Sequence, residues 1–484
     1  MDSHISTPVA STIFSNQSPG LDSLMSEAMT SVGILKIFGS LKILKKRGSV
    51  SLAQLVYVLL LLPLLNVDNV WCFCGKFLNN YITGGKDVLY RFLKRQDINW
   101  QRIQLLSSVK IWNEIQEDAL DTDLALLADD TLKIRRGKKV EASSLHYDHN
   151  TGRSVMGQQI LQLGISSKQH FLPLLSQIFV GQKKRQKQNP DFGDQRRSVC
   201  KTYRNAHTKN KNQMLRAMVK QALSSGIKAY YFLADSWFAN KENIQMCLDH
   251  ELIGIMMMKR NRMKYCIEGK EQTLKNMYRS FSKQDFLTHQ SFQYVSVQAR
   301  LNLAPTKEDA NYKMVKLVFS RLKKGPKQSW VVLLCTDPEL EDHKIFEMYS
   351  LRWNLECYFK EAKQYLGFLK EQSSDYTVHY ASIHLTAMRY SLLVYLCVKH
   401  YGGNYATARR EISKTMEFCA FVELSWKWMK DGVFNVMNQQ ELSDVQVKKI
   451  QEALEEEISK MLHQALCLTK NEVQKLENTD KQII

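Results

Sequence analysis

The chain has 484 residues, of which 44% are hydrophobic, so it can build several buried cores and is not an intrinsically disordered polymer. Lysine and arginine number 67 against 48 aspartates and glutamates, which gives a formal net charge of +19 and makes nucleic acid the first expected partner and a membrane surface the second. The ten cysteines form no metal-type CxxC pair, which argues against a zinc site or a disulfide framework and favours a reducing cytoplasm.

The beginning of the chain predicts a loose tail followed by helices. Residues 1–20 are polar and Ser-rich, with no basic segment before an apolar core, so we expect a disordered tail there and no secretory signal. Residues 52–67 are apolar but are interrupted by Gln54, Pro63 and Asn66, and they are shorter than the roughly 20 apolar residues that span a bilayer. A buried helix is the first interpretation, and a membrane-associated protein is the alternative.

Residues 21–110 predict a helical N-terminal region that binds DNA. After Gly84 and Gly85, residues 86–103 have apolar positions for a core on one side. The four cations expected on the other side, as a DNA recognition helix requires, are Lys86, Arg91, Lys94 and Arg95. A solvated basic helix is the alternative interpretation.

Residues 111–263 alternate between helix and strand patterns, which predicts an α/β core. A short apolar strand over residues 122–130 ends in Asp129 and Asp130, and candidate strands around residues 157–163 and 170–179 complete an antiparallel meander. A second apolar strand, over residues 229–235, ends in Asp235.

Between these strands lies a strongly basic run, for which two interpretations stay open: a flexible solvated loop, or a segment that follows a phosphate backbone. Its eleven basic residues are Lys183, Lys184, Arg185, Lys187, Arg196, Arg197, Lys201, Arg204, Lys209, Lys211 and Arg216.

Residues 264–328 lose the helix–strand rhythm, and their alternating hydrophobicity predicts a β-rich insertion. Residues 329–370 restore the core with a strand and a helix, and residues 371–484 again have helical patterns. The predicted organisation therefore runs as tail (1–20), helical region (21–110), core (111–263), insertion (264–328), core (329–370) and C-terminal helices (371–484).

The most informative stretch is Tyr349 to Lys363, which reads YSLRWNLECYFKEAK. Its polar residues Tyr349, Arg352, Glu356 and Lys363 stand at i, i+3, i+7 and i+14, so a single helix would carry all four on one face. One interpretation is an ordinary Arg352–Glu356 ion pair on a solvated surface. The other is a carboxylate that binds a metal, with cations placed to meet phosphates.

Three acids at the ends of core elements favour the metal interpretation. Divalent cations that act on phosphodiesters prefer hard oxygen ligands, and two such ions can activate the attacking oxygen and stabilise the leaving one. Asp129, Asp235 and Glu356 could supply these ligands to two Mg²⁺ or Mn²⁺ ions.

The motifs ADDT (128–131), LADSWF (233–238) and Y-x2-R-x3-E-x6-K resemble those of the DDE transposases of bacterial insertion sequences, in the Y-R-E-K branch called insertion-sequence family four. The resemblance extends over roughly residues 85–370. It implies an RNase H-like core interrupted by a β-rich insertion, with helical N- and C-terminal regions.

The resemblance also implies functions for individual residues. Asp235 and Glu356 become the second and third catalytic acids, and Asp129 is favoured over Asp130 as the first. Tyr349, Arg352 and Lys363 would contact DNA phosphates. Relatives that excise through a hairpin trap a flipped base, for which Phe292, Tyr294 and Tyr312 are candidates, although core packing is the favoured explanation of these aromatic residues.

The activity that the resemblance implies is cut-and-paste transposition. Water would attack the inverted-repeat ends of the element, and the freed 3′-OH would then attack target DNA. We further expect double-stranded DNA as the partner, a homodimer on DNA, no membrane, and a location in the bacterial cytoplasm at the nucleoid. The helices of residues 371–484 could pair the two subunits, and packing on the protein's own core is the equal alternative. A transposase-derived DNA-binding protein that no longer catalyses is the alternative.

Overall fold

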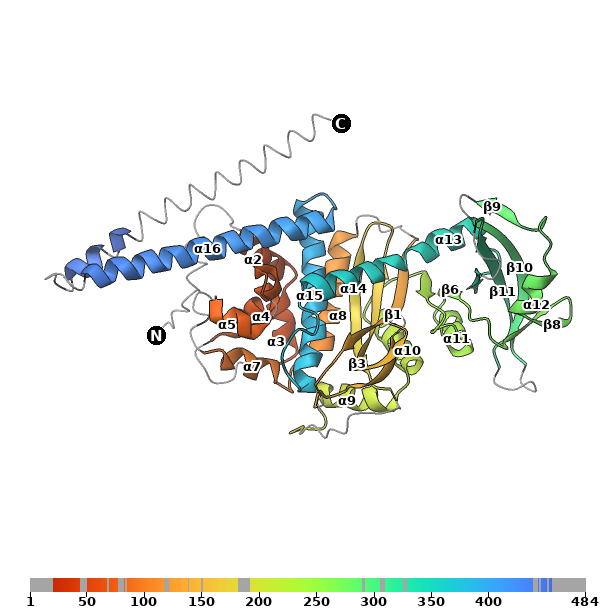
Figure 1. Ribbon diagram of the computed structural model, residues 1–484, viewed down its shortest axis with the longest axis horizontal. Helices are drawn as coiled ribbons and strands as arrows, with labels where there is room; N and C mark the ends of the chain where they lie inside the picture. The colour runs from red at the N-terminus through yellow and green to blue at the C-terminus, as the bar shows by residue number, and fades with distance from the viewer. Residues whose placement is uncertain are drawn as a thin grey trace, which may run out of the picture. The chain divides into compact units, whose positions relative to one another are not determined.

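The computed structural model describes residues 21–43, 50–67, 69–76, 82, 85–116, 122–137, 139–148, 151–181, 192–289, 292–304, 310–324, 329–437, 443, 445–450 and 452–454 (Figure 1). The expected tail over residues 1–20 and most of the C-terminal segment after residue 437 lie outside these ranges. The chain divides into two compact units, residues 1–93 with 395–484, and residues 94–394.

The first unit is helical in the part that the structure describes. Its elements are α2 (Leu21–Ser31), α3 (Ile34–Ser40), α4 (Leu52–Leu61), the 3₁₀ helix η1 (Leu62–Leu65), α5 (Val70–Lys76), α7 (Asp87–Leu93) and α16 (Tyr405–Met437). A capping box formed by Ser51 and Gln54 begins α4, and most of α4 and all of η1 are buried. The predicted buried helix over this apolar stretch is confirmed, and α16 packs against η1 and α2.

The second unit is a mixed α/β structure built on one large mixed sheet. The central strands are β1 (Ala125–Ile134), β2 (Ser144–Asp148), β3 (Arg153–Ser166), β4 (Phe171–Phe179), β5 (Tyr231–Ala234), β6 (Ile253–Met257) and β12 (Trp330–Cys335). Antiparallel pairing of β1 with β3 and of β3 with β4 confirms the predicted meander, to which β2 adds a fourth strand. On its other side β1 pairs in parallel with β5, and β5 pairs in parallel with β6.

Helices cover both faces of these strands. The unit contains α8 (Trp100–Ile115), α9 (Ser198–Thr208), α10 (Lys211–Leu223), α11 (Lys241–Asp249), α13 (Asp342–Ser350), α14 (Trp353–Tyr365) and, up to residue 394, α15 (Tyr376–His400). Helix α14 packs against β1, and α10 packs against β3 and β4. Successive residues of β1 point to opposite faces, toward α14 and toward α10, so these two helices lie on opposite sides of the sheet.

Helix α15 is long and apolar enough to cross a membrane by length and composition, but 94% of its most apolar window is buried within the molecule. Its polar residues have partners in the second unit: His384 Nδ1 lies 2.5 Å from Gln104 Oε1 of α8, and Ser391 Oγ lies 3.4 Å from Ser108 Oγ. Hydrogen-bonded polar residues are typical of an interior position, so α15 is a core helix.

The structure corrects two local predictions. The described part of the basic run, residues 192–216, is mainly helical rather than a loop, because Val199, Cys200 and Ala206 give α9 a buried side and a capping box formed by Asn210 and Gln213 begins α10. Residues 86–103 are two helices, α7 and α8, with Asn99 as the N-cap of the second.

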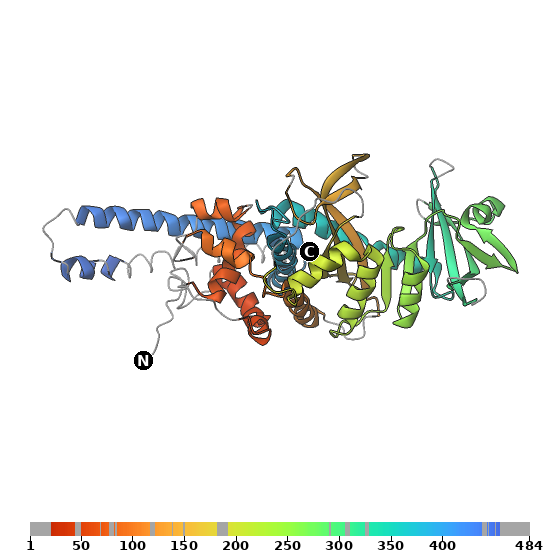
Figure 2. The same cartoon turned by 90° about the horizontal axis from the view of Figure 1, so that it is seen from below.

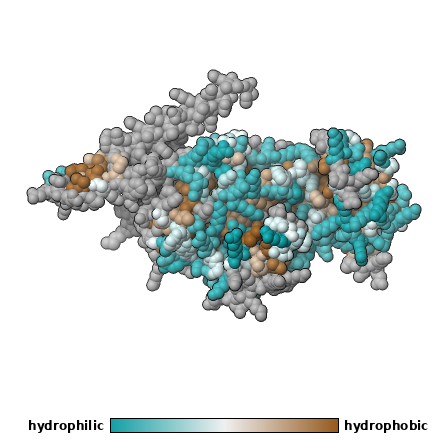
Figure 3. Space-filling view, viewed as in Figure 1, coloured by the Kyte–Doolittle hydropathy of each residue, from teal (hydrophilic) through white to brown (hydrophobic). Residues whose placement is uncertain are grey.

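Residues 264–322 form the β-rich end of the second unit, drawn in green in Figures 1 and 2. They contain β7 (Lys264–Ile267), β8 (Lys270–Thr273), α12 (Leu274–Ser280), β9 (Leu287–His289), β10 (Phe292–Asn302) and β11 (Tyr312–Leu322). These strands continue the core sheet, because β11 pairs with β12 from Lys316 opposite Cys335 to Arg321 opposite Trp330. Hydrophilic side chains dominate the visible surface of this end (Figure 3).

Candidate active site

The three acids reach one place because of strand register and one helix. Ala128 of β1 pairs with Ala234 of β5, so the residues that follow them, Asp129 and Asp235, are the next neighbours across adjacent parallel strands. Such strands lie about 4.8 Å apart. Glu356 lies in the first turn of α14, the helix that packs on β1.

Arg352 connects the third acid to the first. Its Nη1 lies 3.0 Å from Asp129 Oδ2, and its Nη2 lies 2.5 Å from Glu356 Oε1. The side chains of Arg352 and Asp129 are each 18% exposed, and that of Glu356 is 34% exposed. The guanidinium therefore holds both carboxylates in a partly buried cluster. The Arg352–Glu356 ion pair is present, but it does not lie on a solvated surface as one interpretation expected.

Burial and the closeness of like charges raise the pKa values of the two aspartates. Burial, and then the charge of Asp235, raise the pKa of Asp129 to about 7, although the Asp130 backbone N–H and Arg352 act in the opposite direction. Burial also raises the pKa of Asp235, against a hydrogen bond from the Trp237 backbone N–H. The cluster thus has more negative charge than Arg352 compensates, and it favours a proton or an additional cation.

Asp130 belongs to the other face of the sheet. Lys211 Nζ at the start of α10 lies 2.6 Å from Asp130 Oδ2, and Gln159 Nε2 donates to Asp130 Oδ1 at 2.5 Å. The Lys211 and Asp130 side chains are only 7% and 16% exposed. Asp129 and Asp130 therefore have different partners, because the side-chain direction alternates along β1.

The predicted single helix from Tyr349 to Lys363 is interrupted. Helix α13 ends at Ser350 and α14 begins at Trp353, and between them Leu351 and Arg352 donate their backbone N–H groups to the carbonyl oxygens three residues earlier. This tight turn changes the helical phase before Glu356. A sequence pattern cannot reveal it, because both residues keep helical backbone angles.

Tyr349 and Lys363 occupy different surroundings. The Tyr349 hydroxyl is buried beside Arg352, and burial raises its pKa to about 12 although Arg352 acts in the opposite direction. Lys363 is exposed near the end of α14, and surrounding protein atoms, then the charge of Lys133 on β1, lower its pKa. No described contact joins Lys363 to the acids.

The four N-terminal cations have different surroundings. Lys86 lies with Nζ 4.1 Å from the centroid of the Trp71 ring, and Arg91 is exposed on α7. Lys94 lies beyond α7 and pairs with Asp375 at 2.7 Å. Arg95 corrects the prediction of an outward-pointing residue: its side chain is 8% exposed and contacts Asp97 at 2.6 Å, because α7 ends at Leu93 and Arg95 falls in the following turn.

The aromatic candidates of the β-rich end are mostly packed. Phe292 and Tyr294 lie 4.9 and 5.4 Å from Phe346 of α13, measured between ring centroids. Tyr312 is 45% exposed.

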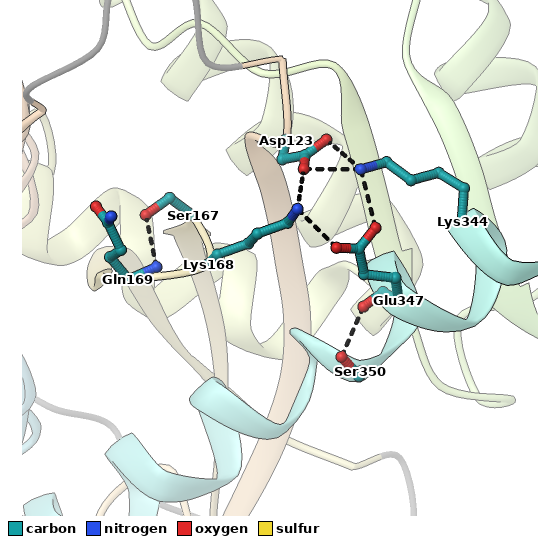
Figure 4. A network of polar contacts seen from close by, with 7 residues as sticks. All are labelled: Asp123, Ser167, Lys168, Gln169, Lys344, Glu347 and Ser350. Atoms are coloured by element: carbon teal, nitrogen blue, oxygen red, sulfur yellow. Dashed lines mark hydrogen bonds and ion pairs between the residues drawn. The ribbon is translucent and has the colours of Figure 1, made fainter. Parts of the chain in front are cut away.

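A second charged network holds α13 in place (Figure 4). Asp123, just before β1, lies 2.7 Å from Lys168 and 2.6 Å from Lys344, and Glu347 lies 2.6 Å from Lys168 and 3.0 Å from Lys344. Partial burial alone would raise the pKa of Asp123, but hydrogen bonds from the two lysines lower it overall. The network fixes α13 one to two turns before Arg352.

Three residues beside the acids escaped the sequence interpretation. In the sequence, Trp237 belongs to the LADSWF motif and Lys211 to the run of eleven basic residues, but neither residue is distinguished from its neighbours there. No sequence motif draws attention to Lys259. The structure places the Lys211 and Lys259 ammonium groups 4.1 and 4.3 Å from the centroid of the Trp237 ring. The signal available in the sequence was the position of each residue just beyond a strand or at a helix start.

The chemistry of the cluster fits a divalent cation. Its donors are hard carboxylate oxygens, and its negative charge exceeds that of its guanidinium. In the described part of the chain, no three metal-ligating side chains converge in this conformation, because the Arg352 guanidinium lies between Asp129 and Glu356.

Two protein-family models match the chain, and both describe enzymes that cut DNA. The family model of the DDE superfamily endonuclease matches residues 78–275, and that of the transposase DDE domain matches residues 199–392. The first range includes Asp129, the second includes Glu356, and both include Asp235. These matches support a DDE transposase or endonuclease, an enzyme class that acts on DNA and uses divalent metals.

Two further comparisons add little. No curated protein matches the chain. The crystal structure of the NurA nuclease from Sulfolobus solfataricus shares 11% identity over 50% of this chain and 81% of its own, but its TM-score of 0.23 carries no argument about the fold.

Proposed function

We propose that this chain is a transposase of the Y-R-E-K branch, insertion-sequence family four, which cleaves the inverted-repeat ends of its element and joins the freed 3′-OH to target DNA. The observation that carries the proposal is the contact of Arg352 with both Asp129 and Glu356, beside Asp235, since it gathers the acids of three separate motifs. The two family models support the nuclease class on independent grounds.

Asp129, Asp235 and Glu356 would hold two Mg²⁺ or Mn²⁺ ions. When bound, such ions supply an activated attacking oxygen and stabilisation of the leaving oxygen. The protein contributes positioning: register between β1 and β5 sets the distance between the aspartates, and packing of α14 on β1 sets that of the glutamate. Because its pKa is about 7, Asp129 keeps its proton in about half of the molecules at that pH unless a cation compensates its charge.

The basic and phenolic residues around the acids would bind the DNA backbone. Arg352 has a planar fork that suits phosphate as well as carboxylate, so it can exchange its carboxylate partners for a phosphate. The Tyr349 hydroxyl lies beside Arg352 and would donate a hydrogen bond to the same phosphate. Lys363 is exposed on α14 and can meet a phosphate farther along the strand.

The remaining parts of the proposal concern organisation. Residues 111–263 and 329–370 would form the RNase H-like core, with residues 264–328 as its insertion. Exposed Lys86, Arg91 and Lys94 would contact DNA from the N-terminal region. Within residues 371–484, α15 is a core helix, so the part beyond it would pair two subunits. We place this activity at the nucleoid in the bacterial cytoplasm.

The test uses DNA that carries the sequences flanking the coding region. The wild-type protein is expected to nick this DNA with Mn²⁺ or Mg²⁺ and not with EDTA. Asp235→Asn and Glu356→Gln should abolish nicking while binding to the same DNA persists. Asp249→Asn is the matched control, because it makes the same change on an exposed residue of α11.

Two results would contradict the proposal. Nicking that survives in both acid variants would show that another site or a contaminant cuts. A wild-type protein that binds the flanking DNA but never cuts it, with either metal, would favour the non-catalytic DNA-binding alternative.

A further inference from the structure

The Trp237 side chain lies beside the acid cluster, and the proposed cleavage does not use it. Trp237 lies in the turn between β5 and α11, and Asp235 Oδ1 accepts its backbone N–H at 2.9 Å. The side chain is 51% exposed. One acid of the cluster therefore fixes the backbone that presents an aromatic ring to solvent.

Two lysines contact this ring, and they differ in how firmly the protein holds them. Lys211 and Lys259 both lie within the range of a cation–π contact. Lys211 is almost fully buried and is bound to Asp130, so it supports the ring as a fixed part of the structure. Lys259 is exposed, so its ammonium group can leave the ring for another partner.

Strand order places these groups in a row. The parallel strands β1, β5 and β6 are adjacent, and Ala128, Ala234 and Met256 are in register across them. Asp129 follows the first of these residues, Trp237 lies beyond the second, and Lys259 lies beyond the third. The row thus leads from the acids to an aromatic ring and then to a cation, along the edge where parallel strands end and ligands commonly bind.

We propose that Trp237 and Lys259 bind a nucleotide next to the phosphate that is cut, with its base stacked on the indole ring and its phosphate on the Lys259 ammonium group. This inference rests on the proposed function, because that function places a phosphodiester at the acids. Exposed aromatic rings beside cations bind single-stranded nucleic acid in this manner, and stacking tolerates any base. A base within a duplex has both faces covered, so the nucleotide is unpaired.

The fixed lysine explains the adjacent acid. Asp130 holds Lys211, and Lys211 lies against Trp237, so Asp130 acts as a positioning residue for the ring. This gives the two adjacent aspartates of β1 separate functions, one on each face of the sheet.

The experiment observes Trp237 directly in the full chain. The eight tryptophans are replaced by 5-fluorotryptophan, and the ¹⁹F resonance of Trp237 is assigned with Trp237→Phe, or with Trp237→Tyr if the first variant does not fold. The probes, added in EDTA, are the tetranucleotide (dT)4 and an abasic tetranucleotide with the same backbone. No cleavage is needed for this readout.

The Trp237 resonance is expected to shift with (dT)4 and not with the abasic probe, because only the first offers a base. Lys259→Gln should weaken the (dT)4 titration by about fivefold or more, while Lys313→Gln, an exposed cation on β11, should leave it unchanged. A resonance that does not move with (dT)4, or moves equally with both probes, would overturn the inference. Nicking by the wild-type protein with Mn²⁺, measured on the same preparation, tests the proposed function separately.

Discussion

At the scale of single residues, the cluster of Asp129, Asp235 and Glu356 has more negative charge than Arg352 compensates. Burial beside Asp235 raises the pKa of Asp129 to about 7. Arg352 compensates part of this charge through its contacts with Asp129 and Glu356. Stability should therefore depend on pH and on divalent cations in ways that single substitutions change.

The first prediction concerns pH. The pKa of Asp129 rises from an ordinary value of 3.8 to about 7 on folding, so the folded protein keeps a proton that the unfolded chain has lost. This contribution to stability is fully present below 3.8 and is lost as the pH rises through 7. In EDTA, the melting temperature of the wild type should fall between about pH 5 and about pH 8 by more than that of Asp129→Asn.

Thermal denaturation of both proteins over this range makes the comparison, with Asp249→Asn as the control that should follow the wild type. If the pH profiles of wild type and Asp129→Asn are parallel, Asp129 does not have the raised pKa.

The second prediction concerns Arg352. Arg352→Gln removes the compensating cation from two partly buried carboxylates, so the free energy of unfolding in EDTA should fall by about 1–3 kcal/mol. Added Mn²⁺ should raise the melting temperature of the variant by more than that of the wild type, since the acids no longer share a guanidinium. An equal Mn²⁺ shift in both proteins would show that Arg352 does not compete for these carboxylates.

At the scale of elements, α13 and α14 deliver Arg352 and Glu356, and the network of Asp123, Lys168, Lys344 and Glu347 secures α13. Sequence patterns predicted the helical character of this region, the strand that carries Asp129 and the strand that precedes Asp235, but the prediction that the first strand ends at the acids is wrong, because β1 continues to Ile134 in its pairing with β3. They did not predict the turn at Leu351 and Arg352, because its backbone angles are helical and only its hydrogen bonds differ. Nor could they predict the Lys211–Asp130 pair, whose residues are 81 positions apart in the chain.

The third prediction tests this network. Lys344 and Lys168 each contact both Asp123 and Glu347. The Lys344 side chain is 23% exposed, whereas that of Lys168 is 51% exposed. Lys344→Met should reduce the nicking rate by roughly tenfold through displacement of α13, with a stability loss of about 1 kcal/mol. Lys168→Met, with a more solvated pair, should change both quantities little. Nicking rates and melting temperatures check this order, and a larger effect of Lys168→Met would contradict it.

At the scale of the whole molecule, alternating helix and strand patterns predicted an α/β core, and the large mixed sheet agrees with this prediction. The net charge predicted a nucleic-acid partner. Alternating hydrophobicity located strands over residues 264–322 but could not show that they extend the core sheet, because pairing of β11 with β12 depends on partners distant in sequence. The same limit applies to Arg95, whose burial depends on where α7 ends.

The central claim is that Asp129 and Glu356 act as one unit with Asp235 on DNA. The most direct test is a double-mutant comparison of nicking rates with Mn²⁺ for Asp129→Asn, Glu356→Gln and the combined variant. Each single variant should lose at least about a thousandfold in rate, and the combined variant should be no slower, because residues that act as a unit are not additive. Single variants that keep substantial activity, with losses that multiply in the combination, would contradict the account.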